Sequence, residues 1–265
     1  MAVLALGACS DDDGGDTTSG SSSGSGSGSG SAAEAPPTIE EGTLTVCSDI
    51  PYEPFEFEGD GPSGYTGFDI DLLAAVAETS SLELSVSDVD FDGILGNLAA
   101  DSCDVVASAV TITDERAEQV DFTESYFDAD QSLLVKTDTD IAGLDDLDGK
   151  TIGVQSGTTG ETYAKDNTPD GAEVKSFEGA DALFAAIESG DIDAILQDFP
   201  VNAYRATQDD SVDVVEEYTT DEAYGFAVKK GNTELLDALN AGLTSVRDDG
   251  DYDTIYEEYF GDAPK

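Results

Sequence analysis

The sequence predicts an α/β protein made of two similar lobes, and three observations indicate this fold class. From Thr43 onward, short β-rich segments alternate with stretches whose apolar residues recur at helical spacing. Such alternation is typical of parallel sheets covered by helices. One pattern also occurs twice, at 92–109 and 181–198, and the chain after residue 41 is long enough for two lobes with separate cores.

The expected strands and helices can be placed along the chain from these patterns. Strands are expected in TLTVC (43–47), LELSV (82–86), DVVASAV (104–110), TIGV (151–154), DAIL (193–196) and VDVV (212–215). A helix is expected at 68–79 and another around Leu236, Leu239, Leu243 and Val246, because their apolar residues fall on one helical face. The last helix is expected in YDTIYEEYF, with aromatic side chains that pack in the core.

The repeated pattern indicates how the lobes form a site. Each copy is expected to form an amphipathic helix, a short turn and a buried strand that ends at a polar loop. Segments 131–136 and 224–230 are expected to be strands that cross between the lobes. Ligands of open α/β sheets bind beyond the carboxyl ends of the strands, so we expect the binding site in a cleft between the lobes.

Charge and composition exclude several classes of function. The chain carries 59 acidic and 10 basic residues, a net charge of −49, which excludes nucleic-acid binding. We interpret the acidic residues as a hydrated surface suited to high salt. The absence of histidine excludes Ser-His-Asp and Cys-His catalysis and His-ligated zinc or haem, and we expect neither a cofactor nor a metal.

The three cysteines lack CxxC spacing, which argues against a zinc or redox site. Cys47 and Cys103 are either small apolar strand residues or a disulfide, and the sequence does not choose between these. Cys9 ends the segment Leu6-Gly7-Ala8-Cys9, which looks like a bacterial lipobox whose cysteine becomes lipidated. A basic region and most of the apolar stretch of a signal peptide are missing, so the alternative is a short apolar N-terminus without function.

The domain organisation follows from these segments. Residues 1–9 are interpreted as a truncated signal and lipobox, and 10–41 as a disordered acidic tether whose stretch 19–31 is entirely Ser and Gly. Residues 42–132 with 229–265 are expected to form lobe 1, and 133–228 lobe 2. The folded part is therefore expected outside the cytoplasmic membrane, anchored to its outer face by lipidated Cys9.

Arg116 is the first candidate ligand-binding residue. Thr113 has the character of a helix cap and is followed by two acidic residues, which places Arg116 third in the helix, where a cation opposes the helix dipole. A surface salt bridge to Asp114 or Glu118 is one explanation, but it would contribute little. The alternative is that Arg116 and the Thr111 hydroxyl hold an anion, because arginine matches a carboxylate with two hydrogen bonds.

Asp198 is the second candidate, because it corresponds to Ala109 in the repeat and ends the matching strand of the other lobe. An acid opposite an arginine suits an amino-acid zwitterion, with the carboxylate at Arg116 and the ammonium at Asp198. The alternative is that Asp198 caps the next segment. The loop VQSGTTGETYAK adds Thr158 and Thr159, and it lacks the Gly-Lys-Ser/Thr ending of a nucleotide-binding loop.

The loops that end the first lobe's strands add further candidates. DVDFDG (88–93) resembles a calcium loop, but Ala99 stands where a bidentate Glu is required, so calcium is rejected. Phe91 is either a core residue or an aromatic that stacks on the ligand. Asp49 and Tyr52 are candidates to contact a ligand side chain, whereas Phe55 is expected to pack.

Six segments, in this order, closely resemble the extracellular solute-binding proteins of family 3, the polar amino-acid receptors of ABC importers. They are SDIPYEPFEF, GYTGFDIDLLAAVAE, FDGIL, TITDERAEQVDFTESYF, IGVQSGTTGETYAK and DAILQDFP, and the resemblance covers residues 43–261. It implies a two-lobed periplasmic-binding-protein fold of type II, a Venus flytrap with two hinge strands that closes on one amino acid.

The resemblance also implies roles for individual residues. In such receptors Arg116 would hold the ligand carboxylate with the help of Thr111, and Asp198 would hold the ammonium, with Ala109 and the Thr159 region contributing. Tyr52 and Phe91 would sandwich the ligand side chain, and Asp49 would contact its polar end. The full set of expected ligand-binding residues is Asp49, Tyr52, Phe91, Ala109, Thr111, Arg116, Gln155, Thr158, Thr159 and Asp198.

These inferences predict a binding protein and not an enzyme. The expected partners are a free amino acid, an ABC permease and a lipid anchor, and the chain is expected to act as a monomer. No second cation occurs in the candidate loops, which disfavours acidic ligands, whereas Asp49 and Gln155 suit glutamine, arginine, lysine or histidine. The alternatives are a cyclohexadienyl dehydratase on the same fold and a ligand-sensing receptor for a membrane kinase.

Overall fold

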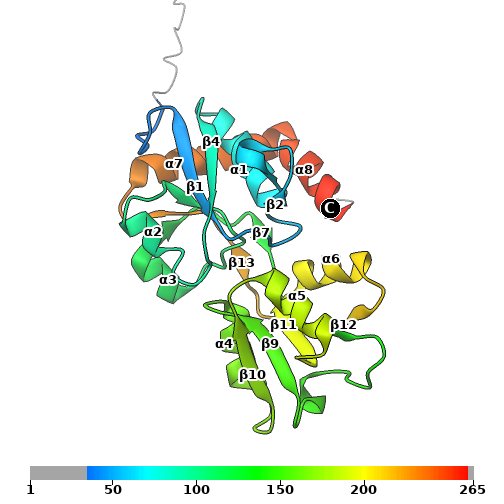
Figure 1. The fold of residues 1–265 in the computed structure, drawn as a ribbon. Helices are drawn as coiled ribbons and strands as arrows, with labels where there is room; N and C mark the ends of the chain where they lie inside the picture. The colour runs from blue at the N-terminus through cyan, green and yellow to red at the C-terminus, as the bar shows by residue number, and fades with distance from the viewer. Residues whose placement is uncertain (1–34, 262–265) are drawn as a thin grey trace, which may run out of the picture. The chain divides into compact units, whose positions relative to one another are not determined.

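Two five-stranded sheets organise the part of the chain that the computed structural model describes, residues 35–261 (Figure 1). The sheet of the first lobe has the strand order β4 (Glu83–Asp88), β1 (Thr43–Ser48), β5 (Val105–Val106), β14 (Ala227–Lys229) and β6 (Val120–Phe122). That of the second lobe has the order β10 (Glu173–Phe177), β9 (Thr151–Gln155), β11 (Ala194–Asp198), β8 (Gln131–Lys136) and β12 (Val212–Tyr218). The predicted two-lobed α/β fold is confirmed.

Helices and two short ribbons complete each lobe. The helices of the first lobe are η1 (Pro62–Gly64), α1 (Phe68–Glu78), α2 (Gly96–Ala99), α3 (Asp114–Gln119), α7 (Thr233–Asp249) and α8 (Asp251–Phe260). Those of the second are η2 (Leu144–Asp146), α4 (Thr159–Asn167), α5 (Ala180–Ser189) and α6 (Phe199–Gln208). β2 (Phe57–Glu58) pairs with β3 (Tyr65–Thr66), and β7 (Phe127–Asp128) with β13 (Ala223–Tyr224). Within residues 35–261, no helix has both the length and the apolar character needed to span a membrane.

Both sheets are mixed and not wholly parallel. β1 runs parallel to β4 and β5, and β9 runs parallel to β10 and β11, as the alternating pattern predicts. The antiparallel pairs in the two sheets all involve β8 or β14, the strands that follow the connections between the lobes. Because the chain reverses direction at these connections, β8 and β14 run antiparallel to the strands on either side of them.

The two segments expected to cross between the lobes do not cross as strands. Segment 131–136 lies wholly in the second sheet as β8, and 227–229 lies in the first sheet as β14. The connections run through the β7–β13 ribbon, residues 129–130 and residues 219–222. Gln131 and Ser132 therefore pair in the second sheet, and Ala227 and Val228 in the first. The chain changes lobe earlier than expected at both connections, at 129–130 instead of 132–133 and at 219–222 instead of 228–229.

The repeat is present in both lobes, but its first helix is much shorter than expected. The second copy forms the ten-residue α5, which ends at left-handed Gly190. The first copy forms only the four-residue α2. Gly93 adopts a φ of +83° and interrupts the helical pattern, because such a backbone is accessible to glycine and incompatible with a helix.

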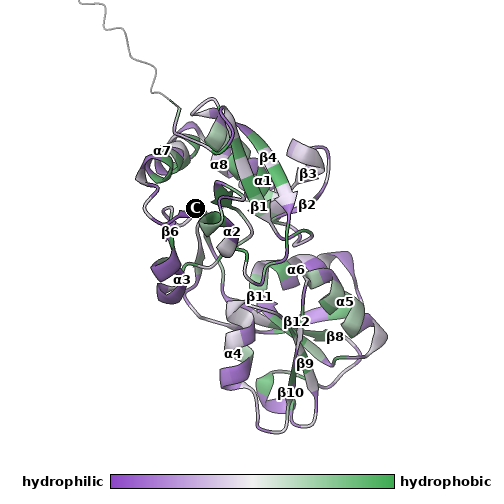
Figure 2. Ribbon diagram, turned by 60° about the vertical axis from the view of Figure 1, so that its left-hand side comes forward, coloured by the Kyte–Doolittle hydropathy of each residue, from purple (hydrophilic) through white to green (hydrophobic). Residues whose placement is uncertain are grey.

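The cores lie on both faces of the sheets, as the apolar patterns predict. In Figure 2 α3 is mostly hydrophilic, whereas four of the six residues of β1 are buried. Phe55 and Phe68 are fully buried in the first lobe, and Leu133 and Leu196 in the second. The aromatic residues of α8 pack against the first core, which confirms the expected packing role of Phe55 and of the last helix.

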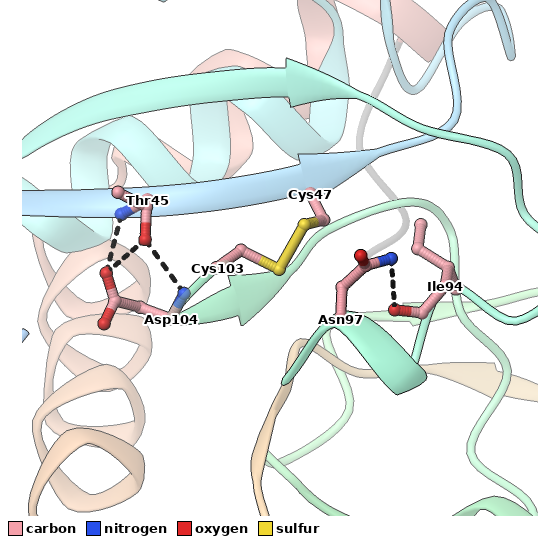
Figure 3. Close-up of a disulfide and its surroundings, with 6 residues drawn as sticks. All are labelled: Thr45, Cys47, Ile94, Asn97, Cys103 and Asp104. Atoms are coloured by element: carbon pink, nitrogen blue, oxygen red, sulfur yellow. Dashed lines mark hydrogen bonds between the residues drawn. A yellow bond between two sulfur atoms is a disulfide. The ribbon is translucent and has the colours of Figure 1, made fainter. Parts of the chain in front are cut away.

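Cys47 of β1 and Cys103 form a disulfide, which decides between the two interpretations of this pair (Figure 3). Beside it, the carboxylate of Asp104 accepts hydrogen bonds from the backbone and hydroxyl of Thr45. Asp104 also accepts a hydrogen bond from the backbone N–H of Ile39 at 2.8 Å. The end of the segment expected as a tether is therefore attached to the first lobe, while Cys9 and residues 10–34 lie outside the described residues.

Candidate functional site

The loops that follow β1, β4, β5, β9 and β11 surround a cavity with an empty volume of about 280 Å³. All ten residues expected from the sequence line it, and Ser108 is the one addition: Asp49, Tyr52, Phe91, Ser108, Ala109, Thr111, Arg116, Gln155, Thr158, Thr159 and Asp198. A larger open groove of about 1650 Å³ runs along α6 and α8, but no lysine or arginine of residues 35–261 lines it. The cavity is therefore the better candidate for a ligand that carries a carboxylate.

Arg116 reaches the cavity from the first turn of α3. Thr113 caps this helix by accepting the Arg116 N–H at 3.2 Å, so the sequence placed the helix start correctly. The guanidinium donates to the carbonyl oxygen of Thr111 at 2.8 Å and to that of Gly157, in the second lobe, at 3.0 Å. It also lies over the ring of Phe91, 5.4 Å from its centroid.

No ion pair joins Arg116 to another residue of the described chain. The expected alternative, a surface salt bridge to Asp114 or Glu118, is therefore wrong. Burial lowers the pKa of Arg116, and the charge of Asp198 partly opposes that shift. The result is a half-buried cation whose hydrogen bonds go to neutral carbonyls, an environment that favours the approach of an anion.

Asp198 ends β11 on the opposite side of the cavity and is buried. Its side chain makes no cap hydrogen bond to α6, although it stands at the cap position. Instead its carboxylate accepts hydrogen bonds from the hydroxyl of Tyr52 at 3.0 Å, from the hydroxyl of Tyr224 and from the amide of Gln131. The interpretation of Asp198 as an ordinary helix cap is therefore wrong.

Burial raises the pKa of Asp198 to about 6, although the hydrogen bond from Tyr224 acts in the opposite direction. A buried carboxylate with a raised pKa gains from a nearby cation, because the cation favours the charged form. The arrangement of the cavity thus places a cation and an acid at separate points of one small space, which suits the two ends of a zwitterion.

Asp49 and Gln155 face each other from the two lobes. The amide of Gln155 donates to the Asp49 carboxylate and, at 3.1 Å, to the carbonyl oxygen of Glu178. Burial raises the pKa of Asp49 to about 6, and the hydrogen bond from Gln155 opposes this shift. An acid beside an amide can accept from a ligand cation or amide, as the sequence reasoning expected.

The two aromatic candidates occupy different environments. Tyr52 is buried, and its hydroxyl contacts Asp198 of the other lobe. Phe91 lines the cavity and also packs against a small core that contains the disulfide. Phe91 therefore combines the two roles, core residue and cavity aromatic, between which the sequence left the choice open.

The threonines connect the loops around the cavity. Thr158 caps α4 by accepting the N–H of Glu161 at 3.0 Å, and it donates to the carbonyl of Gln155. The hydroxyls of Thr111 and Thr159 lie 3.4 Å apart across the two lobes. These contacts fix the loops that follow β5 and β9.

Two buried acids, Glu56 and Asp69, hold residues that line the cavity. Glu56 accepts the hydroxyl of Ser108 at 2.8 Å, and Asp69 accepts the N–H of Ala109 at 2.8 Å and the hydroxyl of Tyr126 at 2.6 Å. Burial raises the pKa of Glu56 well above its usual range, and the charge of Asp69 adds to the shift. These bonds hold Ala109 at a φ of +46°, in the left-handed region that costs an L-residue energy.

Sequence reasoning missed several residues of this site. The sequence could have pointed to Gln131, because it is a polar residue at the start of the apolar run QSLLVK. Ser108 directly precedes Ala109, and its place beside a predicted residue was a weak signal. Glu222 had none, since it is one of 59 acidic residues and lies in a connection whose path the pattern does not reveal.

Comparison with protein families gives one model that matches the chain. The family described as bacterial extracellular solute-binding proteins, family 3, matches residues 44–262. A similar curated protein is the L-cystine-binding protein TcyJ of Escherichia coli strain K12, 33% identical over 226 residues and covering 84% of each chain. The arginine-binding extracellular protein ArtP of Bacillus subtilis strain 168 is 33% identical over 213 residues, which cover 79% of this chain and 82% of ArtP.

The similar solved structures are also amino-acid-binding proteins. An ancestral arginine-binding protein bound to glutamine has a TM-score of 0.79 and 40% identity, with 84% of this chain and 100% of that chain covered. An ancestral amino acid-binding protein described as a precursor of cyclohexadienyl dehydratase has a TM-score of 0.74 and 40% identity, with 83% and 95% covered. Both resemblances extend over the two lobes.

Proposed function

Because the chain belongs to family 3 of the bacterial extracellular solute-binding proteins, we propose that it is the substrate-binding receptor of an ABC importer. It binds a polar or basic L-amino acid, namely glutamine, arginine, lysine or histidine. One observation carries the proposal: Arg116 and Asp198, from different lobes, line one cavity without an ion pair between them. The ligand carboxylate pairs with the first and the ligand ammonium with the second.

Binding is coupled to closure of the lobes. Tyr52 and Asp198, Asp49 and Gln155, and Arg116 and Gly157 form contacts that cross from one lobe to the other. A ligand that binds the closed form more tightly than the open form shifts the population toward closure. The permease distinguishes the loaded receptor by this closure.

The specificity follows from the polar residues that line the cavity besides Arg116 and Asp198. Asp49 and Gln155 offer an acid and an amide, and Arg116 is the only cation among the described residues that lines the cavity. An acidic ligand would bring a second carboxylate without a partner, which is costly in a buried site. Similarity to arginine- and cystine-binding proteins supports an amino-acid ligand. Which amino acid binds is a matter for measurement.

A thermal-shift screen of the twenty amino acids in molar salt tests this proposal. We expect the largest increase in unfolding midpoint among glutamine, arginine, lysine and histidine, and no increase for the Arg116→Ala variant. Arg247→Ala is the matched control, because Arg247 is an exposed arginine outside the cavity. An unchanged ligand response in Arg116→Ala, or calorimetry showing that glutamate binds more tightly than all four, would contradict the assignment.

The alternative function is that of a cyclohexadienyl dehydratase-like enzyme. It is favoured by the structural neighbour described as a precursor of that enzyme, and Asp198 or Asp49, each with a pKa raised to about 6, could act as the acid. Incubation with prephenate and arogenate decides, since turnover would support the enzyme and its absence the receptor.

The receptor acts outside the cytoplasmic membrane, attached to its outer face through lipidated Cys9 and working as a monomer beside its permease. The lipobox-like LGAC segment and the Ser/Gly-rich stretch that follows it support this placement. Mass spectrometry of the membrane fraction tests it. A lipid-modified N-terminal Cys9 is expected. If the wild-type protein and the Cys9→Ser variant were recovered from the same fraction, that result would contradict the lipid anchor.

A further inference from the structure

Glu222 lies in the connection between β12 and β13, outside the loops that the sequence assigned to the site. Its carboxylate accepts a hydrogen bond from the hydroxyl of Thr111, in the first lobe, at 3.1 Å. Both of its oxygens also lie 3.4 Å from the amide nitrogen of Gln131, in the second lobe. One side chain of the connecting segment therefore binds both lobes at the cavity.

Gln131 relates Glu222 to the acid at the proposed ammonium position. The same amide nitrogen of Gln131 donates to Asp198, so one neutral amide is shared by two carboxylates. A primary ammonium carries three N–H donors and a full charge, whereas the amide carries two donors and no charge. A ligand ammonium would therefore neutralise the charges of Asp198 and Glu222 better than the Gln131 amide does alone.

The charge of Glu222 reaches both ends of the zwitterion site. It is among the causes that raise the pKa of Asp198, and it opposes the lowering of the pKa of Arg116. Glu222 also borders the outer groove next to Arg116, Thr158 and Thr159. It is half-buried, so solvent screens its charge only in part.

We infer that Glu222 is a positioning residue of the binding site, which aligns Thr111 and Gln131 and adds a second negative charge close to Asp198 for the ligand ammonium. This inference rests on the proposed function. The residue sits on a segment that joins the lobes, so its two hydrogen bonds tie the ammonium end of the cavity to the hinge.

The sign of the pH effect follows from Asp198. Its pKa is raised to about 6, so binding of an ammonium is strongest above that pH and weakens as the pH falls through it. Without the charge of Glu222 the pKa of Asp198 falls, and binding persists to lower pH. The other charged or titratable groups that face Asp198 and Glu222 are Arg116 of α3, Tyr52 after β1, Tyr224 of β13, and Asp130 and Asp221 of the connections.

Titration calorimetry with arginine and with glutamine in molar salt tests the inference on the full chain. At pH 8 the Glu222→Gln variant is expected to bind about tenfold more weakly, because the ammonium loses a nearby charge. From pH 8 to pH 5 the wild type is expected to lose about tenfold in affinity, and the variant less. Glu217→Gln is the matched control, since this exposed acid of β12 does not line the cavity.

Two results would overturn the inference. One is a Glu222→Gln variant with the affinity and pH profile of the wild type and of Glu217→Gln. The other is a loss of affinity that is equal at both pH values and accompanied by a lower unfolding midpoint, which indicates a structural role only.

A wild type that binds no amino acid would refute the proposed function instead. The ligand-free protein then still decides the inference, through an NMR titration of the Asp198 carboxyl carbon. A lower pKa of Asp198 in Glu222→Gln than in Glu217→Gln supports it, and identical pKa values overturn it.

Discussion

Arg116 shows at the scale of one residue why a position that is unfavourable for the helix can be retained. A cation in the first turn opposes the helix dipole, yet the guanidinium of Arg116 is held by two backbone carbonyls, one from each lobe. Neutral carbonyls orient the side chain without neutralising it. A ligand carboxylate then gains both the charge of the arginine and a pair of hydrogen bonds.

Asp49 carries the prediction that belongs to this scale. The Asp49→Asn variant is expected to weaken arginine binding by about tenfold or more and glutamine binding much less, because only the cationic side chain loses a charge-assisted hydrogen bond. Titration calorimetry at pH 8 measures the two affinities. Asp90→Asn, a nearby exposed acid, controls for the general loss of negative charge, and an equal effect on both ligands would contradict the role of Asp49.

At the scale of elements, the sequence predicted the strand ends well and the connections poorly. The residues beyond β1, β5, β9 and β11 could be found because buried strands have a clear apolar pattern and their carboxyl ends share one edge of a sheet. Asp49, Arg116 and Asp198 were found in this way. Glu222 and the antiparallel direction of β8 and β14 were not predicted. Their positions depend on where the chain passes from one lobe to the other, and the local spacing of apolar residues does not indicate this.

The disulfide gives the prediction for this scale, because it links β1 to the residues just before β5 across a separation of 56 residues. Replacing both Cys47 and Cys103 by alanine is expected to lower the free energy of unfolding by about 2–4 kcal/mol, since the unfolded chain regains the entropy of an open loop. Chemical denaturation in a Cys9→Ser background measures the loss, with Cys9→Ser alone as the control. If reduction with a thiol reagent leaves the control's midpoint unchanged, the disulfide does not stabilise the fold.

At the scale of the whole molecule, the net charge of −49 sets the conditions in which the protein is stable. The Debye length grows from roughly 3 Å at 1 M salt to roughly 10 Å at 0.1 M, so repulsion among surface acids extends further as salt is removed. We expect the unfolding midpoint to fall steadily when NaCl is lowered from molar concentration to about 20 mM. Circular dichroism follows the transition, KCl at equal ionic strength should give the same midpoint, and an unchanged spectrum and midpoint would contradict the expectation.

The path of the chain through the two sheets has a consequence for the order in which the protein is made. All five strands of the second sheet come from the continuous stretch 131–218, whereas the first sheet needs β14, which lies between β5 and β6 and is the partner of β6. A growing chain leaves the ribosome from its N-terminus. The second lobe can therefore complete its sheet while the first still lacks an inner strand, so the lobe that begins first is the one that finishes folding last.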